Sequence, residues 1–443
     1  MDASWFNYNG VSVFSSMAYE KSANLQHNLG LNSNYINSYI YAPQTPVYNA
    51  MMSLKYLVNN DDSIMNDRLF EKVAENDRFV AYRNNYCLPI AYSVSEEVEK
   101  WITTGSNPFE IQNDYWTRAT DAGDVFKRIS ATTYSTENIR SDDELLTENF
   151  SYNKEITGQE GSIVIKYEIP ESQNVYLYTD CKSADTINVS GTNGFSKSQD
   201  PSDPYVLDCG YLEKGEILIP SDKESGYADI YAVGLDMNNF EAGYNKLAAL
   251  AMDISEFTDT HIKGTVNVKA NELVYTSINY DEGWEITVDG EKVEPVALGD
   301  ALIGIDAAPG THTIEMTYKP KGFMIGAVVS AGTLVAFIVA LIIIHIVKKK
   351  RYAKSIEIDS KETVETSTDG PTGIDALMEQ DLGKNATVED VEKLLDVPDE
   401  YEMNKQDPTE TLNRADEILN TQKINLKEIL SQIEGNDDSE DKE

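Results

Sequence analysis

Alternation of apolar and polar residues runs through the middle of the chain and predicts short β-strands. Residues Ser162–Ile169 alternate in this way, and Val175–Tyr178 follow a turn predicted at Pro170–Ser172. The same alternation returns in Thr311–Tyr318. Short strands separated by turns at this spacing are typical of a β-sandwich or jelly roll, which we expect over residues 131–320.

A β-hairpin is predicted near the end of this region. Trp284–Val288 leads into Asp289-Gly290, and Glu291–Val293 is the expected return strand. Asp-Gly is favoured in two-residue hairpin turns because both positions tolerate positive φ. Between the strands, helix is expected only near Asn245–Met252.

Residues 1–130 mix helix and strand patterns and predict an α+β region. Asn107–Glu110 is a helix start, in which Asn caps the helix, Pro occupies its first position and Glu its third. Ser95–Val98 opens another short helix with acids near its positive end. Arg78–Tyr82 alternates like a strand, and Met51–Val58 is apolar enough to lie in the core.

Residues Phe323–Val347 contain no charged side chain and predict a membrane-spanning helix in contact with lipid. As a helix this run of 25 residues is about 37 Å long, more than the ~30 Å hydrocarbon core of a bilayer. Four cations, Lys348–Arg351, directly follow the run, whereas only Lys319 and Lys321 lie close before it. The positive-inside rule therefore predicts that residues 1–322 are extracellular and residues 348–443 cytoplasmic.

The segment after the span is acidic. Residues 348–443 carry a net charge of −13, and the polar stretch 355–371 is predicted to be disordered. Asp407–Glu410 predicts the start of a helix over residues 408–434, with a cap, a proline and an acid in order. Apolar residues there recur every seven positions, which fits either a short coiled-coil seam or an ordinary amphipathic helix. Either form offers a face for a partner protein.

Charge and composition exclude two classes of protein. The 443 residues include 36 Lys and Arg against 75 Asp and Glu, a net charge of −39. Such a surface repels a phosphate backbone, so nucleic acid is not an expected partner. Hydrophobic residues make up 41% of the chain and 26 residues are tyrosines, which is too much apolar material for a wholly disordered protein.

The first residues do not explain how an extracellular region is exported. Met1–Trp5 has neither the basic nor the apolar region of a signal peptide. We therefore expect the chain to be the C-terminal part of a longer protein whose upstream spans export this region.

The sequence contains no recognisable catalytic or cofactor motif. There is no zinc-protease, P-loop, nucleophile-elbow or CxxC pattern. The four histidines are scattered along the chain: His27, His261, His312 and His345. We accordingly assign no catalytic, cofactor-binding or metal residue and expect no cofactor.

Cysteines and acids allow weaker interpretations. Cys181 and Cys209 could form a disulfide or remain buried thiols, and Cys87 is unpaired in either case. Loop carboxylates could hold calcium, but their spacing matches no known cation loop and the neighbouring prolines fit an ordinary solvated loop. The acids concerned are Asp180, Asp185, Asp200, Asp203 and Asp208.

Exposed tyrosines and the four tryptophans are the candidates for contact with a sugar ring. Aromatic faces stack on sugars, but most aromatic residues of β proteins belong to strands and cores. The four tryptophans open to either interpretation are Trp5, Trp101, Trp116 and Trp284.

Several short motifs, in order, resemble the YfhO family of bacterial membrane proteins. Each is weak alone, but their order over about residues 5–350 is specific. The motifs are Phe6–Met17, Ser53–Val58, Asn84–Pro89, Asn107–Asn113, Gly283-Trp284 with Val288–Gly290, and Pro309–His312 before the final helix.

The resemblance implies a large multi-pass protein of the GT-C glycosyltransferase type. Members of that family are associated with decorating cell-wall polymers such as lipoteichoic acid from a polyprenyl-phosphate sugar donor outside the membrane. Their acidic catalytic residues lie between early membrane helices, so none can be assigned to a position in this chain. This region would then support binding of the acceptor or of a glycan. The alternative is a self-standing single-pass surface protein whose β-sandwich binds glycans or proteins.

Overall fold

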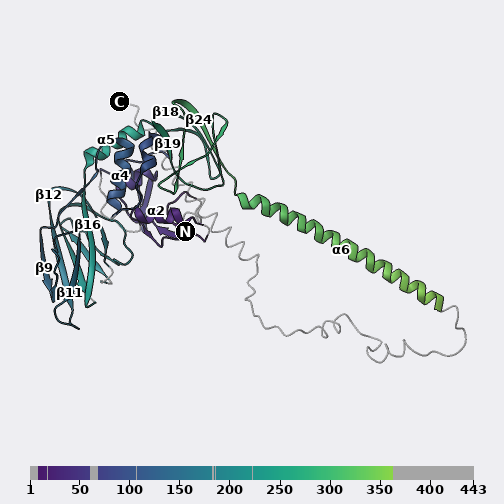
Figure 1. Ribbon diagram of the computed structural model, residues 1–443, viewed down its shortest axis with the longest axis horizontal. Helices are drawn as coiled ribbons and strands as arrows, with labels where there is room; N and C mark the ends of the chain where they lie inside the picture. The colour runs from purple at the N-terminus through teal and green to yellow at the C-terminus, as the bar shows by residue number, and fades with distance from the viewer. Residues whose placement is uncertain are drawn as a thin grey trace. The chain divides into compact units, whose positions relative to one another are not determined.

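The computed structural model describes residues 8–16, 18–59, 68–105, 107–181, 184, 186–221 and 223–362 (Figure 1). This part of the chain is mainly β with few helices, as predicted. Trp5, Asp185 and the predicted helix 408–434 lie outside the described residues.

The largest sheet has nine strands and occupies the middle of the chain. Its path is β10-β11-β16-β12-β15-β13-β14, with β8 paired to β16 and β9 to β12. The strands are β8 (Phe126–Arg128), β9 (Thr133–Glu137), β10 (Ile139–Arg140), β11 (Asn149–Lys154), β12 (Gly161–Asp180), β13 (Ile187–Gly191), β14 (Ser196–Gln199), β15 (Leu207–Ser221) and β16 (Ser225–Leu235).

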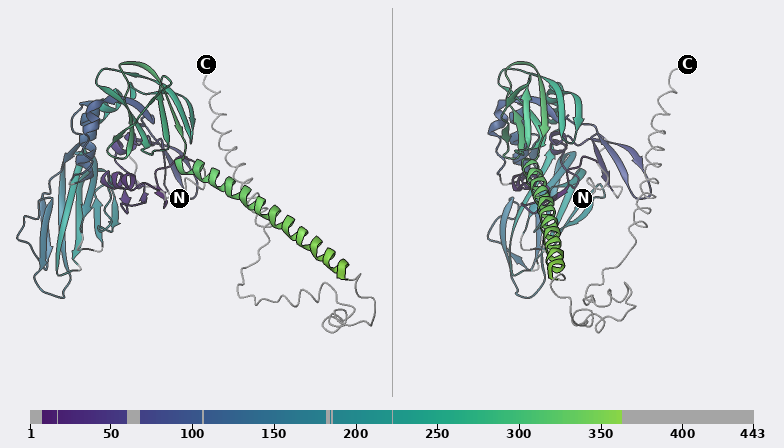
Figure 2. Two further views of the ribbon diagram at one scale, coloured as in Figure 1. Left: turned by 45° about the vertical axis from the view of Figure 1, so that its right-hand side comes forward. Right: turned by 90° about the vertical axis from the view of Figure 1, so that its right-hand side faces the viewer.

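Two long strands, β12 and β15, run through both halves of this sheet. The first half of β12 pairs with β9 and its second half with β16, while β15 pairs with both halves on the other side, from Gly161 to Leu177 with an interruption after Glu168. Apolar side chains from both halves form one buried cluster, from Ile129 to Ala232. The sandwich or jelly-roll description stays a prediction. Figure 2 shows the strands of this sheet lying alongside one another from two further directions.

The turn predicted at Pro170–Ser172 is wrong. β12 continues through Pro170 as a single strand. Its register against β15 shifts between Glu168 and Gln173. An irregularity of this kind leaves residues outside the ladder, so the missing N–H of proline costs no ladder hydrogen bond there.

Two further sheets are built largely from the last third of the β region. One has the order β17-β18-β24-β20-β21 and the other β22-β23-β19-β7. The strands are β7 (Ala91–Ser95), β17 (Asp253–Thr258), β18 (His261–Val268), β19 (Glu272–Asn279), β20 (Trp284–Val288), β21 (Glu291–Val293), β22 (Val296–Leu298), β23 (Leu302–Ile305) and β24 (Gly310–Tyr318).

The predicted hairpin is confirmed in this region. β20 pairs with β21, and Asp289 and Gly290 have φ of 53° and 84°. Both turn residues therefore occupy the left-handed region that the Asp-Gly pair tolerates.

The N-terminal part is the predicted mixture of helices and strands. Its two small sheets have the orders β1-β3-β2 and β4-β6-β5. The elements are β1 (Val13–Phe14), α2 (Glu20–Asn28), β2 (Asn32–Ser33), β3 (Ser38–Ile40), α3 (Pro46–Met51), β4 (Tyr56–Asn59), β5 (Phe70–Glu75), β6 (Val80–Asn84), the 3₁₀ helix η1 (Glu96–Lys100) and α4 (Pro108–Thr120).

Both predicted helix starts are confirmed. The Asn107 side chain accepts hydrogen bonds from the backbone N–H groups of Phe109 and Glu110, each at 3.1 Å, at the start of α4. Ser95 caps η1 by accepting from the N–H of Glu97. Sequence rules for caps succeed here because both bonds are local.

The helix expected near Asn245–Met252 begins earlier. α5 spans Met237–Ala248, and Asp236 caps its first turn. Gly243, a poor helix former, lies in the middle of α5, where a Cβ would be 2.4 Å from Nε1 of Trp116 on α4. Close packing of the two helices therefore outweighs the low propensity. Figure 1 shows α4 and α5 side by side.

One strand pairing joins distant parts of the chain. β7 pairs with β19 from Glu272↔Ser95 to Thr276↔Ala91. The buried rings of Tyr92 and Tyr275 lie 4.9 Å apart between centroids. One buried apolar cluster consequently extends from Ala23 to Leu302. The domain boundary expected at residue 130 stays a prediction.

The predicted apolar helix is present as α6 (Lys321–Glu362). Residues Ile325–Lys354 of α6 are long and apolar enough to cross a membrane. The helix continues to Glu362, so the prediction of disorder from residue 355 is wrong for residues 355–362.

A pH-dependent ion pair connects the turn of the β20–β21 hairpin to strand β24. His312 Nδ1 lies 2.7 Å from Asp289 Oδ2, and this contact raises the pKa of His312 above its ordinary value of 6.5. A raised folded-state pKa means that the stabilisation is complete below about pH 6.5 and is lost as pH rises through the folded pKa.

We expect Asp289→Asn to lower the pKa of His312, because it removes the carboxylate. NMR titration of the histidine ring signals in the full chain in detergent micelles measures this. Glu256→Gln, beside His261, is the matched control and leaves the His312 titration unchanged. An unaltered His312 pKa in Asp289→Asn would contradict the assignment.

Candidate functional site

The tryptophans proposed as sugar contacts differ in how far they are buried. Trp101 and Trp116 are buried, and Trp101 Nε1 donates to the Ile111 carbonyl at 2.9 Å. The sugar-contact interpretation is therefore wrong for both. Trp284 is half-buried and lines a surface hollow of about 400 Å³.

This hollow, which we call the aromatic pocket, lies between the N-terminal segment and the sheet that contains β20 and β24. Its lining includes four aromatic rings, two carboxylates and an amide. The residues are Tyr19, Tyr39, Asp259, Asn279, Asp281, Trp284 and Tyr318.

Asp281 is the polar centre of the aromatic pocket. Its Oδ2 accepts a hydrogen bond from Tyr318 Oη at 3.2 Å, and its Oδ1 accepts from the Gly283 N–H at 2.6 Å. A hydrogen bond to Asp281, together with burial, raises the pKa of Tyr19 to about 12. Burial and the Asp281 charge also raise the pKa of Tyr318. Both phenols therefore remain protonated donors at neutral pH.

Strand register places the two rings of the pocket wall. Trp284 and Tyr318 are cross-strand partners in β20 and β24, and their ring centroids are 5.1 Å apart at an interplanar angle of 57°. Position 283 favours glycine, because a Cβ there would lie 2.7 Å from Cε2 of Tyr318. The absence of a side chain lets the backbone before β20 approach the Tyr318 ring closely, and both rings line the same hollow.

The aromatic pocket suits an uncharged, polyhydroxylated ligand. Aromatic faces offer apolar surface for the C–H groups of a sugar, while Asn279 and Asp281 offer hydrogen-bond acceptors for its hydroxyls. The described residues that line it include two carboxylates, Asp259 and Asp281, and no lysine or arginine. This charge disfavours a phosphate group.

A second hollow, of about 360 Å³, crosses strands β9, β12, β15 and β13. We call it the polar groove and define it by Lys166, Glu168, Ser190, Thr192, Lys214 and Glu216. Two cross-strand ion pairs, Lys166–Glu216 and Lys214–Glu168, each have an N–O distance of 3.2 Å.

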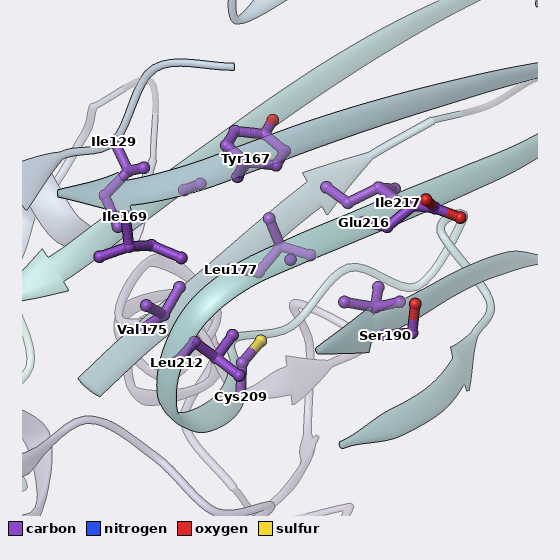
Figure 3. Close-up of a pocket in the computed structure, with 13 residues that line it drawn as sticks. Ile129, Tyr167, Ile169, Val175, Leu177, Ser190, Cys209, Leu212, Glu216 and Ile217 are labelled. Carbon is purple, nitrogen blue, oxygen red and sulfur yellow. The ribbon is translucent and has the colours of Figure 1, made fainter. Parts of the chain in front are cut away.

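A small cavity of about 30 Å³ lies in the core of the nine-stranded sheet (Figure 3). Apolar side chains, among them Ile169, Val175 and Leu212, surround one end in Figure 3, and Ser190 and Glu216 lie at the other.

The calcium hypothesis is not supported. Within the described ranges, no three His, Cys, Asp or Glu side chains are grouped so that they could hold a metal ion. Asp200 instead accepts hydrogen bonds from the N–H and hydroxyl of Ser202, and these bonds lower its pKa. Burial raises the pKa of Asp208 to about 7.

No disulfide joins cysteines in the part of the chain that the structure describes. Cys181 and Cys209 are buried thiols. Burial raises the pKa of Cys209 far above its ordinary value, so this thiol stays protonated and inert.

Most of the aromatic pocket was missed by reasoning from the sequence. Trp284 was named as a candidate sugar contact and exposed tyrosines such as Tyr19 only as a class, whereas Asn279 and Asp281 carry no motif. The tight Asp281-Glu282-Gly283-Trp284 turn before a strand is a local signal that could have added Asp281. Tyr19 lies about 260 residues earlier and only packing brings it there.

Comparison with known proteins gives one broad match. The family model described as "Bacterial membrane protein YfhO" matches residues 2–330. The uncharacterized protein YfhO of Bacillus subtilis (strain 168) is 21% identical over 370 residues. That alignment covers 78% of this chain and 42% of the relative, so the chain spans about two fifths of the relative's length.

Solved structures match only weakly. TmCBM61 in complex with β-1,4-galactotriose is 12% identical, with 23% of this chain and 88% of that chain covered and a TM-score of 0.17. A family 29 carbohydrate binding module is 11% identical, with 25% and 88% covered and a TM-score of 0.17. Scores this low carry no argument about function.

We expect Gly283→Ala to disturb the aromatic pocket and destabilise the protein. The added methyl group would displace the Tyr318 ring and approach the Lys319 carbonyl at 3.1 Å, and overpacking of this kind costs about 1–3 kcal/mol. Urea unfolding of the full chain in micelles, followed by tryptophan fluorescence, measures the change. Gly322→Ala, which meets nothing within 4 Å, is the control. Equal stability of the two variants would show that Gly283 is not required.

Proposed function

Because the chain belongs to the YfhO family of bacterial membrane proteins, we propose that it serves in the glycosylation of cell-wall polymers of the lipoteichoic-acid type. In this proposal a polyprenyl-phosphate sugar is the donor, and this part of the protein binds the acceptor glycan in the aromatic pocket. Catalytic residues are assigned to membrane regions outside this chain, and none of its own residues is given a catalytic role.

The observation that carries the proposal is that the aromatic pocket lies close to the start of the apolar helix α6. Tyr318, which lines the pocket, precedes the first residue of α6, Lys321, by three positions. An extended chain covers at most ~3.6 Å per residue, so the start of the helix is within about 11 Å of Tyr318 Cα. A glycan held there is close to the surface of the membrane that α6 enters.

Charge supports an extracellular pocket. Lys348–Arg351 at the far end of the apolar segment favour the cytoplasmic side, which supports residues 1–322 outside and residues 348–443 inside as part of the proposal. The acidic pocket favours the sugar units of a cell-wall polymer over its phosphates. The proposal also includes a cytoplasmic partner protein for the predicted helix 408–434. It includes no nucleic-acid partner, because the net charge of the chain is strongly negative.

A second candidate function is favoured by the polar groove. In this alternative the chain is a single-pass surface protein whose β-sandwich binds glycans or proteins, independently of any glycosyl transfer. The groove supports it because 360 Å³ of hydrophilic space crosses four strands of one sheet.

We expect Trp284→Ala to weaken binding of lipoteichoic acid about tenfold, because truncation of a central aromatic contact typically costs more than 1 kcal/mol. Binding is measured by microscale thermophoresis with the full chain in lipid nanodiscs, and cell-wall glycosylation is measured in cells that produce the same variant in its full-length protein.

Tyr211→Ala is the matched control, since Tyr211 is an exposed aromatic residue outside the pocket. Wild-type affinity in Trp284→Ala would refute binding in the aromatic pocket. Weakened binding with unchanged glycosylation would refute the role in glycosylation and favour the single-pass surface protein.

A further inference from the structure

We infer that the glycan bound in the aromatic pocket carries a protonated amine, as an amino sugar with a free amino group does. The inference rests on the proposed function, because it takes the pocket to be the glycan site and adds the charge of the ligand. Any sugar can use the ring faces and the hydrogen-bond acceptors. Only a cationic sugar also balances the carboxylates of Asp259 and Asp281, since no lysine or arginine is among the described residues of the lining.

The two carboxylates adjoin the same strand. β24 lies between β18 and β20 in its sheet. On the β18 side, the backbone N–H of Tyr318 donates to the Thr260 carbonyl at 2.8 Å, which places the neighbouring Asp259 beside the end of β24. On the β20 side, Asp281 Oδ2 accepts from Tyr318 Oη at 3.2 Å. Two negative charges that are far apart in the neighbouring turns of the sheet therefore act on one hollow.

Two lysines adjoin pocket residues in the sequence, but each is paired with an acid outside the pocket. Lys319 Nζ is 2.7 Å from Glu285 Oε2. Glu285 follows Trp284 along β20, and successive side chains of a strand point to opposite faces, so this ion pair lies on the face away from the Trp284 ring. Lys21 Nζ is 3.6 Å from Asp300 Oδ1. Neither lysine is paired with a carboxylate of the pocket, whose negative charge is thus available to a ligand.

The aromatic rings add a second attraction for a cation. The face of a tryptophan or tyrosine ring is electrostatically negative and attracts an ammonium group within about 6 Å of its centroid. The centroids of Trp284 and Tyr318 are 5.1 Å apart and their planes are inclined by 57°. One ammonium group can therefore lie within that range of both rings. A hydroxyl at the same place gains neither this attraction nor that of the carboxylates.

Two disaccharides that differ in charge test the inference. The β-1,4-linked glucosamine disaccharide and cellobiose have the same ring skeleton, but carbon 2 carries an amino group in the first and a hydroxyl in the second. Binding to the full chain is measured by NMR titration of the sugar signals at about pH 6, where a free amine is protonated. Micelles of an uncharged polyoxyethylene detergent are used, because such a detergent contains neither a sugar nor an amine that would compete for the pocket.

The wild type should bind the glucosamine disaccharide about tenfold more tightly than cellobiose, which is the order of a cation–π contact in a partly desolvated site. About 0.5 M salt should reduce this preference, because it screens the carboxylates. Equal affinity for the two sugars, binding of neither, or a preference that is insensitive to salt would overturn the inference.

Asp259→Asn tests the contribution of charge with little change of shape. Asp259 is exposed, whereas Asp281 is hydrogen-bonded within its own turn and is left intact. The variant should weaken binding of the glucosamine disaccharide about threefold and leave cellobiose binding unchanged. Asp142→Asn, which removes an exposed carboxylate outside the pocket, is the matched control and keeps the wild-type preference. Equal affinities of Asp259→Asn and Asp142→Asn for the glucosamine disaccharide would also overturn the inference.

The proposed glycan site is tested separately, by the loss of lipoteichoic-acid binding in Trp284→Ala. If that loss is observed and the two disaccharides bind equally, the inference fails and the proposed function stands. If Trp284→Ala binds lipoteichoic acid with wild-type affinity, the proposed function fails and the inference fails with it.

Discussion

The pairing of β7 with β19 is the contact on which the candidate site depends. It joins Ala91–Ser95 to Glu272–Thr276, and the tyrosine rings along it are buried. Tyr92 Oη and Tyr115 Oη are 2.5 Å apart, and Tyr275 Oη donates to the Met51 carbonyl at 3.2 Å. Polar groups are thus satisfied inside an apolar cluster, where an unpaired hydroxyl would cost about 1–3 kcal/mol. Through this pairing, the N-terminal segment is held beside the last sheets.

Within the frame set by that pairing, one carboxylate organises the aromatic pocket. Asp281 is held by its own turn through the Gly283 N–H and accepts from Tyr318 at the end of β24. Tyr19, which belongs to the N-terminal segment, also bonds to it. The residues that line the aromatic pocket therefore also connect the N-terminal segment to the sheet that contains β24. A glycan that occupies the pocket would also contact both of the segments that Asp281 joins.

The two hollows differ in the physical basis of recognition that they offer. The aromatic pocket combines ring faces with hydrogen-bond acceptors, and its two carboxylates disfavour anions. The polar groove has no aromatic ring other than Tyr167 among its lining residues, and it offers a neutral row of paired charges.

Local physics alone determined several parts of this protein. Asn107 caps a helix and Asp289-Gly290 makes a hairpin turn because each needs only neighbouring backbone groups. The uncharged run Phe323–Val347 is helical because an apolar segment of that length satisfies its backbone internally. The order of short motifs was likewise enough to indicate the family.

Only the tertiary structure decided the rest. Pro170 predicts a turn, yet β12 continues through it because the register against β15 shifts at this position. Gly243 argues against a helix, yet the close approach of Trp116 requires it. Tryptophans look alike in sequence, and packing buried Trp101 and Trp116 but left Trp284 on a surface hollow. Sites of this kind depend on contacts between residues far apart in the chain, and the short-range patterns of a single sequence do not record which distant segments meet.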